Sequence, residues 1–495
     1  MAEIRITKVD EVYVKVESEP SIERELVDFF TFDVPNAHFI KSRNTRMRGW
    51  SGKIYLYSAI KKLIFLGLIH HIKVFAKERN ISIVMDEALV NDTLVSVAEF
   101  AAFVKKLDLT KEPRDYQLAA ALECINTNRK LILSPTASGK SLIIFMLVAW
   151  YLIHLSKGKI LIIVPTLNLV HQMASDFVSY GFPDNMIHKI FGGEPVDTNK
   201  RVVISTWQSI YERDTQFFSK FVVTIGDEAH LYRSKSLTMI MKKLKQCKHK
   251  FGFTGTLDNM LTNKLVCEGL FGDVYITQTT KQLIERKNLA TLNPINVLVF
   301  NYPDSICQKI IKEKDYQAEL DFIVTNEYRN NYLKNLALNL KGNTLMLFNF
   351  VDKHGKVLYE LMKQSKDEVY MVYGGVDGEE REEIRRLVQK SNNADIIASY
   401  ATFSTGTNIP NLNNLILASP VKSKIRLLQS IGRILRLGDD KTHCTLFDCA
   451  DDLRAKGKMN TTLTHLQERM KLYDAEGFDY KVINIPLYKG NELNV

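Results

Sequence analysis

Two series of short, continuously apolar runs limit most strongly how this chain can fold. The first series is KLIL at residue 130, KILIIV at 159, RVVIS at 201, FVVTI at 221 and KFGF at 250. The second is TLMLF at 344, EVYMVY at 368, ADIIAS at 394, NLILAS at 414 and CTLF at 444. Strands that are apolar at every position are buried on both faces, which is typical of parallel sheets covered by helices. Because turn residues and helix-compatible stretches follow the runs, the sequence predicts two α/β units.

The segments outside these series have other patterns. Residues 1 to about 105 begin with the alternating ITKVDEVYVKV and predict a small α+β domain, in which Leu63 to Phe75 is expected to be a buried helix. The Lys- and Asn-rich segment 302–343 has helical spacing and is expected to join or decorate the two sheets. Beyond residue 455 we expect a helix and then a short strand, YKVINIP. The expected domains are 1–108, 109–290, 291–455 and 456–495.

Cysteine usage and hydropathy bear on the compartment. The six cysteines are scattered and form no C-x-x-C pair, which argues against a zinc site or a disulfide framework and fits a reducing compartment. The N-terminus lacks the apolar region of a signal peptide. The longest apolar run, Leu142 to Ile153, is shorter than the ~20 residues that span a bilayer. We therefore expect a cytoplasmic protein.

The stretch SPTASGKS has the context of a phosphate-binding loop, because the strand LIL precedes it and an apolar helix follows. In such a loop, backbone N–H groups and the helix N-terminus hold the phosphates. Gly139 lets the backbone approach, Lys140 neutralises the β and γ oxygens, and Ser141 ligates Mg²⁺. Ser134 stands where the first glycine is usual, and a chance G-K-S at a helix start is the alternative. The expected nucleotide-binding residues are Pro135, Thr136, Ala137, Ser138, Gly139, Lys140 and Ser141.

The stretch TIGDEAHLY places two carboxylates at the end of an apolar strand, the edge at which open α/β sheets bind ligands. Asp227 is expected to hold Mg²⁺ through water, and Glu228 to orient the water that attacks the γ-phosphate. A solvated turn is the alternative.

The stretch QSIGRILR lies in the second series. Gln429, Arg433 and Arg436 are four and three residues apart, so we expect them to share one helical face. Arginines contributed by a neighbouring domain stabilise the charge of phosphoryl transfer. A basic face exposed to solvent is the alternative.

Together with T-G-T at Thr254 to Thr256, these motifs resemble, in this order, those of the superfamily two helicases. The resemblance extends from about residue 113 to 450 and implies two tandem RecA-like parallel-sheet lobes, with ATP and Mg²⁺ as cofactors. The fold class expected is thus α/β, with a small α+β domain in front. Lys140, Asp227, Glu228, Gln429, Arg433 and Arg436 are the implied catalytic residues.

The same resemblance implies roles for further residues. RDYQ resembles an adenine-reading element formed by Arg114, Tyr116 and Gln117; a helix start after Pro113 is the alternative. The residues expected to couple hydrolysis to movement are His230, Thr254 and Thr256. Those expected to contact a nucleic-acid strand are Thr166, Thr206 and Thr405, with Gly406 near the nucleotide. Asn408 replaces the acid of the usual G-x-D-x-P, which leaves its contact to the nucleotide sugar open.

The chain is basic, with a formal net charge of +10, which points to a polyanionic partner, although a basic surface that serves solubility gives the same total. From Val34 to Lys77 there are nine Lys and Arg and no acidic residue, interleaved with aromatic residues. This composition is typical of a nucleic-acid surface; a solvated basic face over core aromatics is the alternative. The candidate contacts are Arg43, Arg46, Arg48, Trp50 and Lys53.

The sequence RMRGWSGKIYLY…LIFLGLIHHIKVFAKERN resembles the N-terminal module of the UvsW-type DNA helicases of tailed phages. This resemblance implies a helicase that acts on branched DNA by fork regression, junction branch migration, R-loop unwinding and strand annealing. Three alternatives stay open. They are a duplex translocase that does not separate strands, an RNA helicase, and a nucleotide-gated scaffold that binds DNA without turnover.

Overall fold

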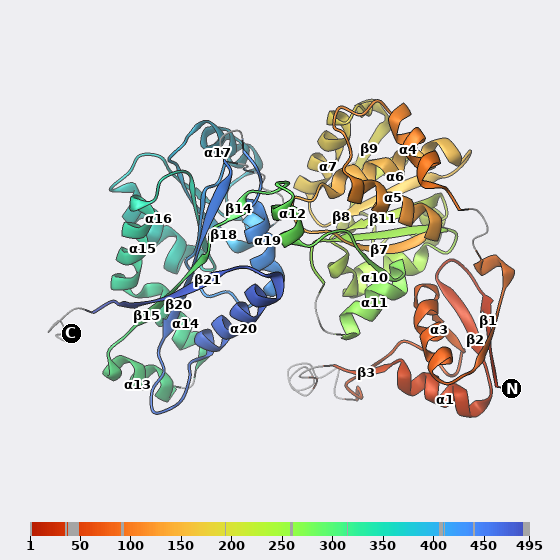
Figure 1. The fold of residues 1–495 in the computed structure, drawn as a ribbon, viewed down its shortest axis with the longest axis horizontal. Coiled ribbons are helices and arrows are strands. Elements are labelled where there is room, and N and C mark those ends of the chain that lie inside the picture. The colour runs from red at the N-terminus through yellow and green to blue at the C-terminus, as the bar shows by residue number, and fades with distance from the viewer. Residues whose placement is uncertain are drawn as a thin grey trace. The chain divides into compact units, whose positions relative to one another are not determined.

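The computed structural model describes residues 2–34, 37, 49–90, 94–193, 195–257, 261–313, 315–404, 409, 411–438 and 441–488. The chain divides into two compact units (Figure 1). The first unit is Met1–Ser134 with Gly139–Thr277, and the second is Pro135–Ser138 with Gln278–Val495. No helix in the described part of the chain combines the length and the apolar character needed to cross a membrane.

The first unit begins with a small α+β region, as expected. Its four-stranded sheet has the order β5-β2-β1-β6. The strands are β1 (Glu3–Lys8), β2 (Tyr13–Glu17), β5 (Leu63–Phe65) and β6 (Ser82–Met85). The helices are α1 (Pro20–Phe29) and α3 (Ile69–Glu78), and a separate two-stranded ladder joins β3 (Thr31–Asp33) to β4 (Lys53–Tyr55). Alternate residues of β1 and β2 are buried, because one face of the sheet lies on the core.

One sequence-based prediction is wrong in this region. The segment from Leu63 to Phe75 is not a single helix, because Leu63–Phe65 forms strand β5 and α3 starts only at Ile69. The three residues pair antiparallel with Tyr13, Val14 and Lys15 of β2. Backbone pairing across the sheet therefore overrides the apolar helical spacing of this stretch.

The larger sheet of the first unit has seven parallel strands in the order β13-β7-β12-β11-β8-β10-β9. The strands are β7 (Arg129–Leu133), β8 (Lys159–Val164), β9 (Ile187–Ile190), β10 (Val202–Thr206), β11 (Phe221–Asp227), β12 (His249–Thr254) and β13 (Val274–Ile276). The longer helices are α4 (Val97–Lys106), α5 (Asp115–Thr127), α6 (Lys140–His154), α7 (Leu167–Ser179), α10 (Lys235–Lys243) and α11 (Leu261–Phe271); α8 (Trp207–Ile210) and α9 (Thr215–Phe218) are short. Each apolar run of the first series forms a strand, whereas the sequence did not indicate the short edge strands β9 and β13.

The second unit repeats the parallel-sheet pattern in the order β17-β18-β16-β19-β20-β15-β21, with β14 beside β20. The strands are β14 (Thr291–Leu292), β15 (Ile295–Asn301), β16 (Thr344–Phe348), β17 (Val369–Val372), β18 (Asp395–Ser399), β19 (Asn414–Leu417), β20 (His443–Asp452) and β21 (Tyr480–Pro486). The helices are α12 (Thr280–Glu285), α13 (Asp304–Glu313), α14 (Tyr316–Thr325), α15 (Glu327–Asn339), α16 (Lys356–Lys363), α17 (Gly378–Lys390), α18 (Tyr400–Ser404), α19 (Lys424–Ile434) and α20 (Thr461–Glu476). Helices lie on both sides of each large sheet (Figure 1), which confirms the predicted fold class.

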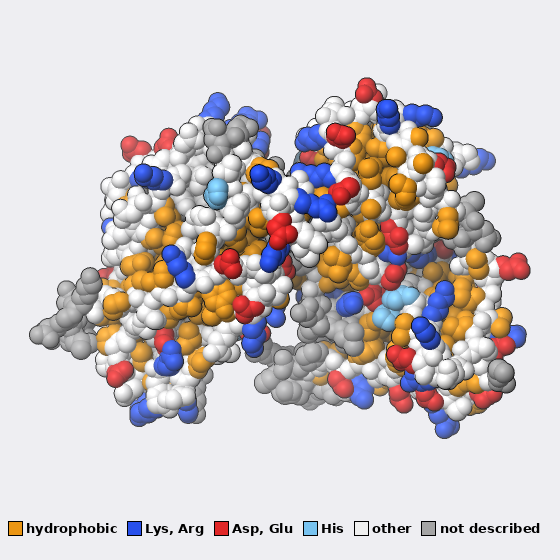
Figure 2. Space-filling view, in the orientation of Figure 1, with side chains coloured by type: hydrophobic (Ala, Val, Ile, Leu, Met, Phe, Trp, Pro, Cys, Tyr) orange, Lys and Arg blue, Asp and Glu red, His pale blue; other side chains and the backbone are white. Residues whose placement is uncertain are grey.

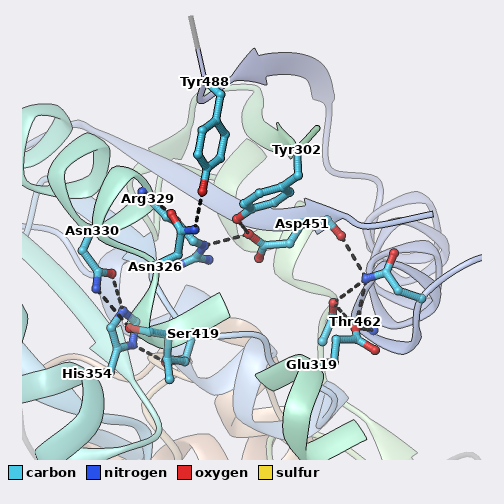
Figure 3. Close-up of polar contacts among 12 residues, drawn as sticks. Tyr302, Glu319, Asn326, Arg329, Asn330, His354, Ser419, Asp451, Thr462 and Tyr488 are labelled. Carbon is cyan, nitrogen blue, oxygen red and sulfur yellow. Dashed lines mark hydrogen bonds and ion pairs between the residues drawn. The ribbon is translucent and has the colours of Figure 1, made fainter. Parts of the chain in front are cut away.

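Buried polar contacts attach the helices of segment 302–343 to the sheet of the second unit (Figure 3). Arg329 of α15 donates from Nε to Asp451 Oδ1 at 2.8 Å, and the Tyr302 hydroxyl donates to the same oxygen at 2.6 Å. Glu319 of α14 accepts the backbone N–H of Thr462 at 2.7 Å, at the start of α20. An acid at that position also favours the helix dipole. The segment is thus part of the second unit's core.

Candidate nucleotide-binding site

The phosphate-binding loop lies between β7 and α6, as predicted. Ala137 and Gly139 have positive φ angles of 65° and 80°, so the backbone turns sharply at both positions. A Cβ atom on Gly139 would lie 2.4 Å from Gln117 Nε2, so the amide of Gln117 would have to move. The positive φ favours glycine at 139, and the close approach of Gln117 adds to this preference.

Ser134, which replaces the usual first glycine, is fully buried. Its backbone N–H donates to Thr254 O at 2.9 Å, and its Oγ accepts from the Thr277 hydroxyl at 3.1 Å. These bonds attach the start of the loop to the ends of β12 and β13. The serine thus fits the loop as an anchor, while the conformation that needs glycine occurs at 139.

The RDYQ element lies against this loop. Gln117 accepts the backbone N–H of Arg114 at 2.9 Å and donates from Nε2 to Gly139 O at 3.4 Å. Tyr116 is 4% exposed, and its hydroxyl accepts from the Arg114 guanidinium at 3.0 Å. A buried ring offers little face for stacking, so of the two residues Arg114 is the better placed for the predicted adenine contact.

A residue that sequence reasoning missed contacts the predicted Mg²⁺ ligand. The hydroxyl groups of Ser141 and Tyr180 lie 2.8 Å apart. Burial raises the pKa of Tyr180, so this phenol keeps its proton and can either donate or accept. Tyr180 directly follows α7 and lies 39 residues after Ser141 in the sequence, so no local motif connects the two.

Of the two carboxylates of the D-E-A-H motif, Asp227 ends β11 and Glu228 follows it. Glu228 has a φ of 50°, and its N–H donates to Asp227 Oδ1 at 2.9 Å. Burial and the neighbouring Glu228 raise the pKa of Asp227, whereas the Lys140 ammonium opposes the shift. The Asp227 carboxylate and the Ser141 hydroxyl are hard oxygen donors of the kind that Mg²⁺ prefers, and the raised pKa reflects a buried carboxylate that a cation would stabilise.

The structure brings the three predicted coupling residues together. His230 Nδ1 lies 3.3 Å from Glu228 Oε2 and 3.0 Å from Thr254 Oγ1. The Thr254 hydroxyl in turn donates to Thr256 O at 2.8 Å. A continuous set of contacts thus runs from the acid after β11 to the loop after β12.

Thr166 and Thr206 lie at the same edge of the sheet. Thr166 follows β8, and Thr206 is the last residue of β10. These two parallel strands are neighbours, and Thr206 pairs with Val164. Thr206 Oγ1 is 2.8 Å from Ser209 Oγ. Thr166 Oγ1 is buried and has no hydrogen-bond partner among the described residues. A buried hydroxyl of this kind is uncommon without a ligand or water to satisfy it.

In the second unit, Gln429 and Arg433 lie on α19, with the Arg433 guanidinium 5.1 Å from the centre of the Phe403 ring. The prediction that Arg436 continues the same helical face is wrong, because α19 ends at Ile434. The buried ammonium of Lys441 donates to Ile434 O, and a cation on a C-terminal carbonyl stabilises a helix end there.

The basic N-terminal segment divides between surface and core. Lys53 and Tyr55 of β4 are exposed, and Trp50 Nε1 donates to Lys53 O at 3.0 Å. Tyr57 is buried, with its hydroxyl on Val16 O. Figure 2 shows basic side chains over both units, mixed with acidic ones on the visible face. The predicted residues Arg43, Arg46, Arg48, Thr405 and Gly406 lie outside the described residues, as does Asn408.

Three family models match the chain. They are "DNA helicase UvsW, N-terminal" over residues 3–86, "Type III restriction enzyme, res subunit" over 110–259, and "Helicase conserved C-terminal domain" over 328–438. The matches follow one another along the chain in the order of the N-terminal sheet, the first large sheet and the second.

Similar proteins agree with this order. The chain is 35% identical to the ATP-dependent DNA helicase uvsW of Enterobacteria phage T4, with 98% of this chain and all of that protein covered. The crystal structure of T4 UvsW matches at 33% identity and a TM-score of 0.51, over 98% of this chain and 100% of that one. The DNA 3'-5' translocase XPB2 of Sulfurisphaera tokodaii is 24% identical over 71% of this chain and 84% of its own.

Proposed function

Because this chain belongs to the UvsW family of ATP-dependent DNA helicases, we propose that it uses ATP hydrolysis to rearrange branched DNA. The chain is an ATP-dependent DNA helicase of superfamily two, with RecA-like lobes. Fork regression, junction branch migration, R-loop unwinding and strand annealing are the reactions we propose, in the replication, recombination and repair of phage DNA.

One observation carries the proposal that hydrolysis is coupled to movement. Contacts run from Glu228 through His230 to Thr254, and Thr254 O also holds Ser134 at the start of the phosphate-binding loop. A change in the contacts of Glu228 when the γ-phosphate is released can therefore be transmitted directly to the ends of β11 and β12. Thr166 and Thr206, at the same sheet edge, are the groups that we propose contact the DNA strand.

We propose the following chemistry for the site. The loop N–H groups and Lys140 hold the phosphates, and Glu228 accepts a proton from the attacking water as the bond from the γ-phosphorus to the bridging oxygen breaks, giving ADP and phosphate. Mg²⁺, held by Ser141 and by Asp227 through water, would neutralise charge on the phosphates. We propose that Gln429, Arg433 and Arg436 stabilise the charge that develops in the transition state.

The N-terminal segment is proposed to hold duplex or junction DNA through Arg43, Arg46, Arg48, Trp50 and Lys53. The exposed positions of Lys53 and Tyr55 support this assignment. We keep 1–108, 109–290, 291–455 and 456–495 as proposed domains. We also propose a location in the cytoplasm of an infected host, which the buried thiols of all six cysteines favour.

The test compares wild-type ATPase and unwinding on single strands, plain duplex, a four-way junction and an RNA–DNA hybrid. We expect DNA to stimulate ATPase strongly and the junction to be the preferred substrate. Lys140→Ala and Glu228→Gln should abolish both activities, because they remove the phosphate-binding cation and the acceptor of the water proton. The exposed positions Lys157→Ala and Glu99→Gln are matched controls.

Each alternative predicts a different result. Movement along duplex without strand separation indicates a translocase, and stimulation by RNA alone indicates an RNA helicase. Equal, DNA-independent ATPase rates in wild type and Glu228→Gln contradict the helicase assignment and favour a scaffold.

A further inference from the structure

A cluster of two histidines and one glutamate joins the N-terminal α+β region to the large sheet of the first unit. His70 and His71 lie in the first turn of α3, and Glu268 lies on α11. His71 Nε2 is 2.5 Å from Glu268 Oε2, and His70 Nε2 is 3.4 Å from the same oxygen. The two imidazole rings lie 4.0 Å apart. Figure 2 shows a group of histidine side chains at the surface of this unit, with acidic side chains beside them.

The hydrogen-bond pattern of His70 identifies which of its nitrogens is open. His70 Nδ1 lies 2.9 Å from the carbonyl oxygen of Gly67, which can only accept, so Nδ1 carries a proton. In the neutral ring Nε2 then has a lone pair, and this lone pair faces a carboxylate oxygen. Nε2 is therefore the His70 nitrogen that is available to bind an ion.

The ligand atoms are close enough to share one ion. One ligand atom from each of the three residues lies within 4.8 Å of the other two. The Glu268 side chain is 3% exposed. Lys264 approaches the other oxygen, Oε1, at 3.6 Å, which leaves Oε2 to the histidines.

Close packing of the backbone holds the cluster in place. A Cβ atom on Gly67 would lie 2.2 Å from the carbonyl oxygen of Glu268, so the turn before α3 touches the backbone of α11 directly. Phe65 packs on Gly269 in the same contact. This packing fixes the two backbones that carry the ligands, and an ion would replace the 2.5 Å hydrogen bond between His71 and Glu268, whose atoms must separate to bind it. The carbonyl on His70 Nδ1 is also the outer contact that orients metal-binding histidines in many proteins.

We propose that His70, His71 and Glu268 bind a Zn²⁺-type divalent ion that fastens the N-terminal α+β region to α11. Two imidazoles and one carboxylate, with water in the fourth position, suit Zn²⁺, whereas Mg²⁺ prefers sites made of oxygen alone. The site is separate from the nucleotide-binding loop, and its role does not depend on the proposed DNA reactions.

The test uses full-length, metal-stripped protein without nucleotide. Zn²⁺ is titrated in competition with a chromophoric chelator, and Co²⁺ is used as a visible probe of coordination. We expect one ion per chain, a Co²⁺ spectrum of low coordination number, and no displacement by excess Mg²⁺. His70→Gln should weaken Zn²⁺ binding by more than about tenfold, because it removes a ligand. This variant keeps the His71–Glu268 contact, so the fold should be preserved.

Two further variants complete the design. Glu268→Gln should also lose the ion. His154→Gln is the matched control, because His154 Nδ1 likewise lies on a helix carbonyl, 2.9 Å from Trp150 O, and is not in the cluster. In thermal unfolding, Zn²⁺ should raise the melting temperature of wild type and of His154→Gln but not of His70→Gln. Equal Zn²⁺ affinity in wild type and His70→Gln, or displacement of the ion by Mg²⁺, overturns the proposal.

Discussion

At the scale of single residues, two hydroxyl contacts explain how this loop departs from the glycine-rich pattern. Ser134 is bonded to Thr277 and to Thr254, so the loop starts from a fixed point. Ser141 is bonded to Tyr180, which holds the hydroxyl near the start of α6. Neither contact has a sequence signature, since each joins segments that are far apart in the chain.

Tyr180→Phe should raise the Mg²⁺ concentration needed for half-maximal ATPase by about fivefold, the equivalent of one hydrogen bond of ~1 kcal/mol. The maximal rate at saturating Mg²⁺ should change little, because Tyr180 orients Ser141 and does not touch the phosphates. Steady-state ATPase as a function of Mg²⁺ measures both quantities. Tyr211→Phe, which loses a bond to Glu212 elsewhere in the unit, is the control. An unchanged Mg²⁺ requirement contradicts this role.

Ser134→Gly should lower the free energy of unfolding by about 1–2 kcal/mol. It removes the hydrogen bond from Thr277, and glycine increases the conformational entropy of the unfolded chain. Urea unfolding measures this loss. Thr277→Val removes the same bond from its other end, so the double variant should be less destabilised than the sum of the two single variants. Strict additivity would show that the two hydroxyls do not interact.

At the scale of the elements, buried Lys and Arg side chains bind backbone carbonyl groups at the end of a helix or between strands. The apolar pattern of the sequence does not predict these contacts. Lys441 contacts the carbonyl of Ile434 at the end of α19, and Arg436 lies beyond this end. Lys250 of β12 donates to Glu11 O at 2.7 Å, and Arg129 of β7 donates to the same oxygen at 2.6 Å. The loop between β1 and β2 is thereby attached to the beginning of two strands of the larger sheet.

Lys250→Met should change the pH dependence of stability. Burial and then the nearby Arg129 lower the pKa of Lys250 from 10.5 to about 7. Between these values the unfolded chain binds the proton and the folded chain does not, so the free energy of unfolding of wild type rises with pH in this window. The variant should lack that rise, which amounts to at most about 1.4 kcal/mol per pH unit. Urea unfolding across the window tests it, with the exposed Lys157→Met as control; parallel curves for wild type and Lys250→Met would refute the assignment.

At the scale of the whole molecule, the N-terminal region and the first large sheet share one hydrophobic core. Phe65 and Leu68 belong to the same buried cluster as Leu270 and Phe271 of α11. The residues before about 108 are therefore part of the first compact unit, although their sequence reads as a separate α+β domain.

Phe65→Ala should cost about 3–5 kcal/mol, and the loss should appear on both sides of this shared core. Hydrogen exchange is the measurement, because it reports protection in β1 and β2 separately from protection in α11. We expect protection to fall in all three elements together. Ile153→Ala, on an exposed side chain of α6, should leave them unchanged. Loss confined to β1 and β2 would show two independent folding units.

The sequence by itself determined the central strands of both large sheets and indicated which residues to expect around the phosphates. Continuous apolar runs predict β7, β8, β11 and β12, because strands buried on both faces must be apolar throughout. Lys140, Asp227 and Glu228 were identifiable because each lies within a few residues of the strand or helix that positions it. Local patterns therefore suffice wherever one short segment carries both the structure and the chemistry.

Only the tertiary structure decided what depends on contact between distant segments. It placed Tyr180 on Ser141, Thr277 on Ser134, and Glu268 beside two histidines that precede it by 197 residues or more. It also turned Leu63–Phe65 into a strand and ended α19 before Arg436. The hydroxyl and histidine contacts join residues far apart in the sequence, and Leu63–Phe65 is a strand because it pairs with β2. Packing and hydrogen bonding across the fold, which no local periodicity encodes, fix these positions.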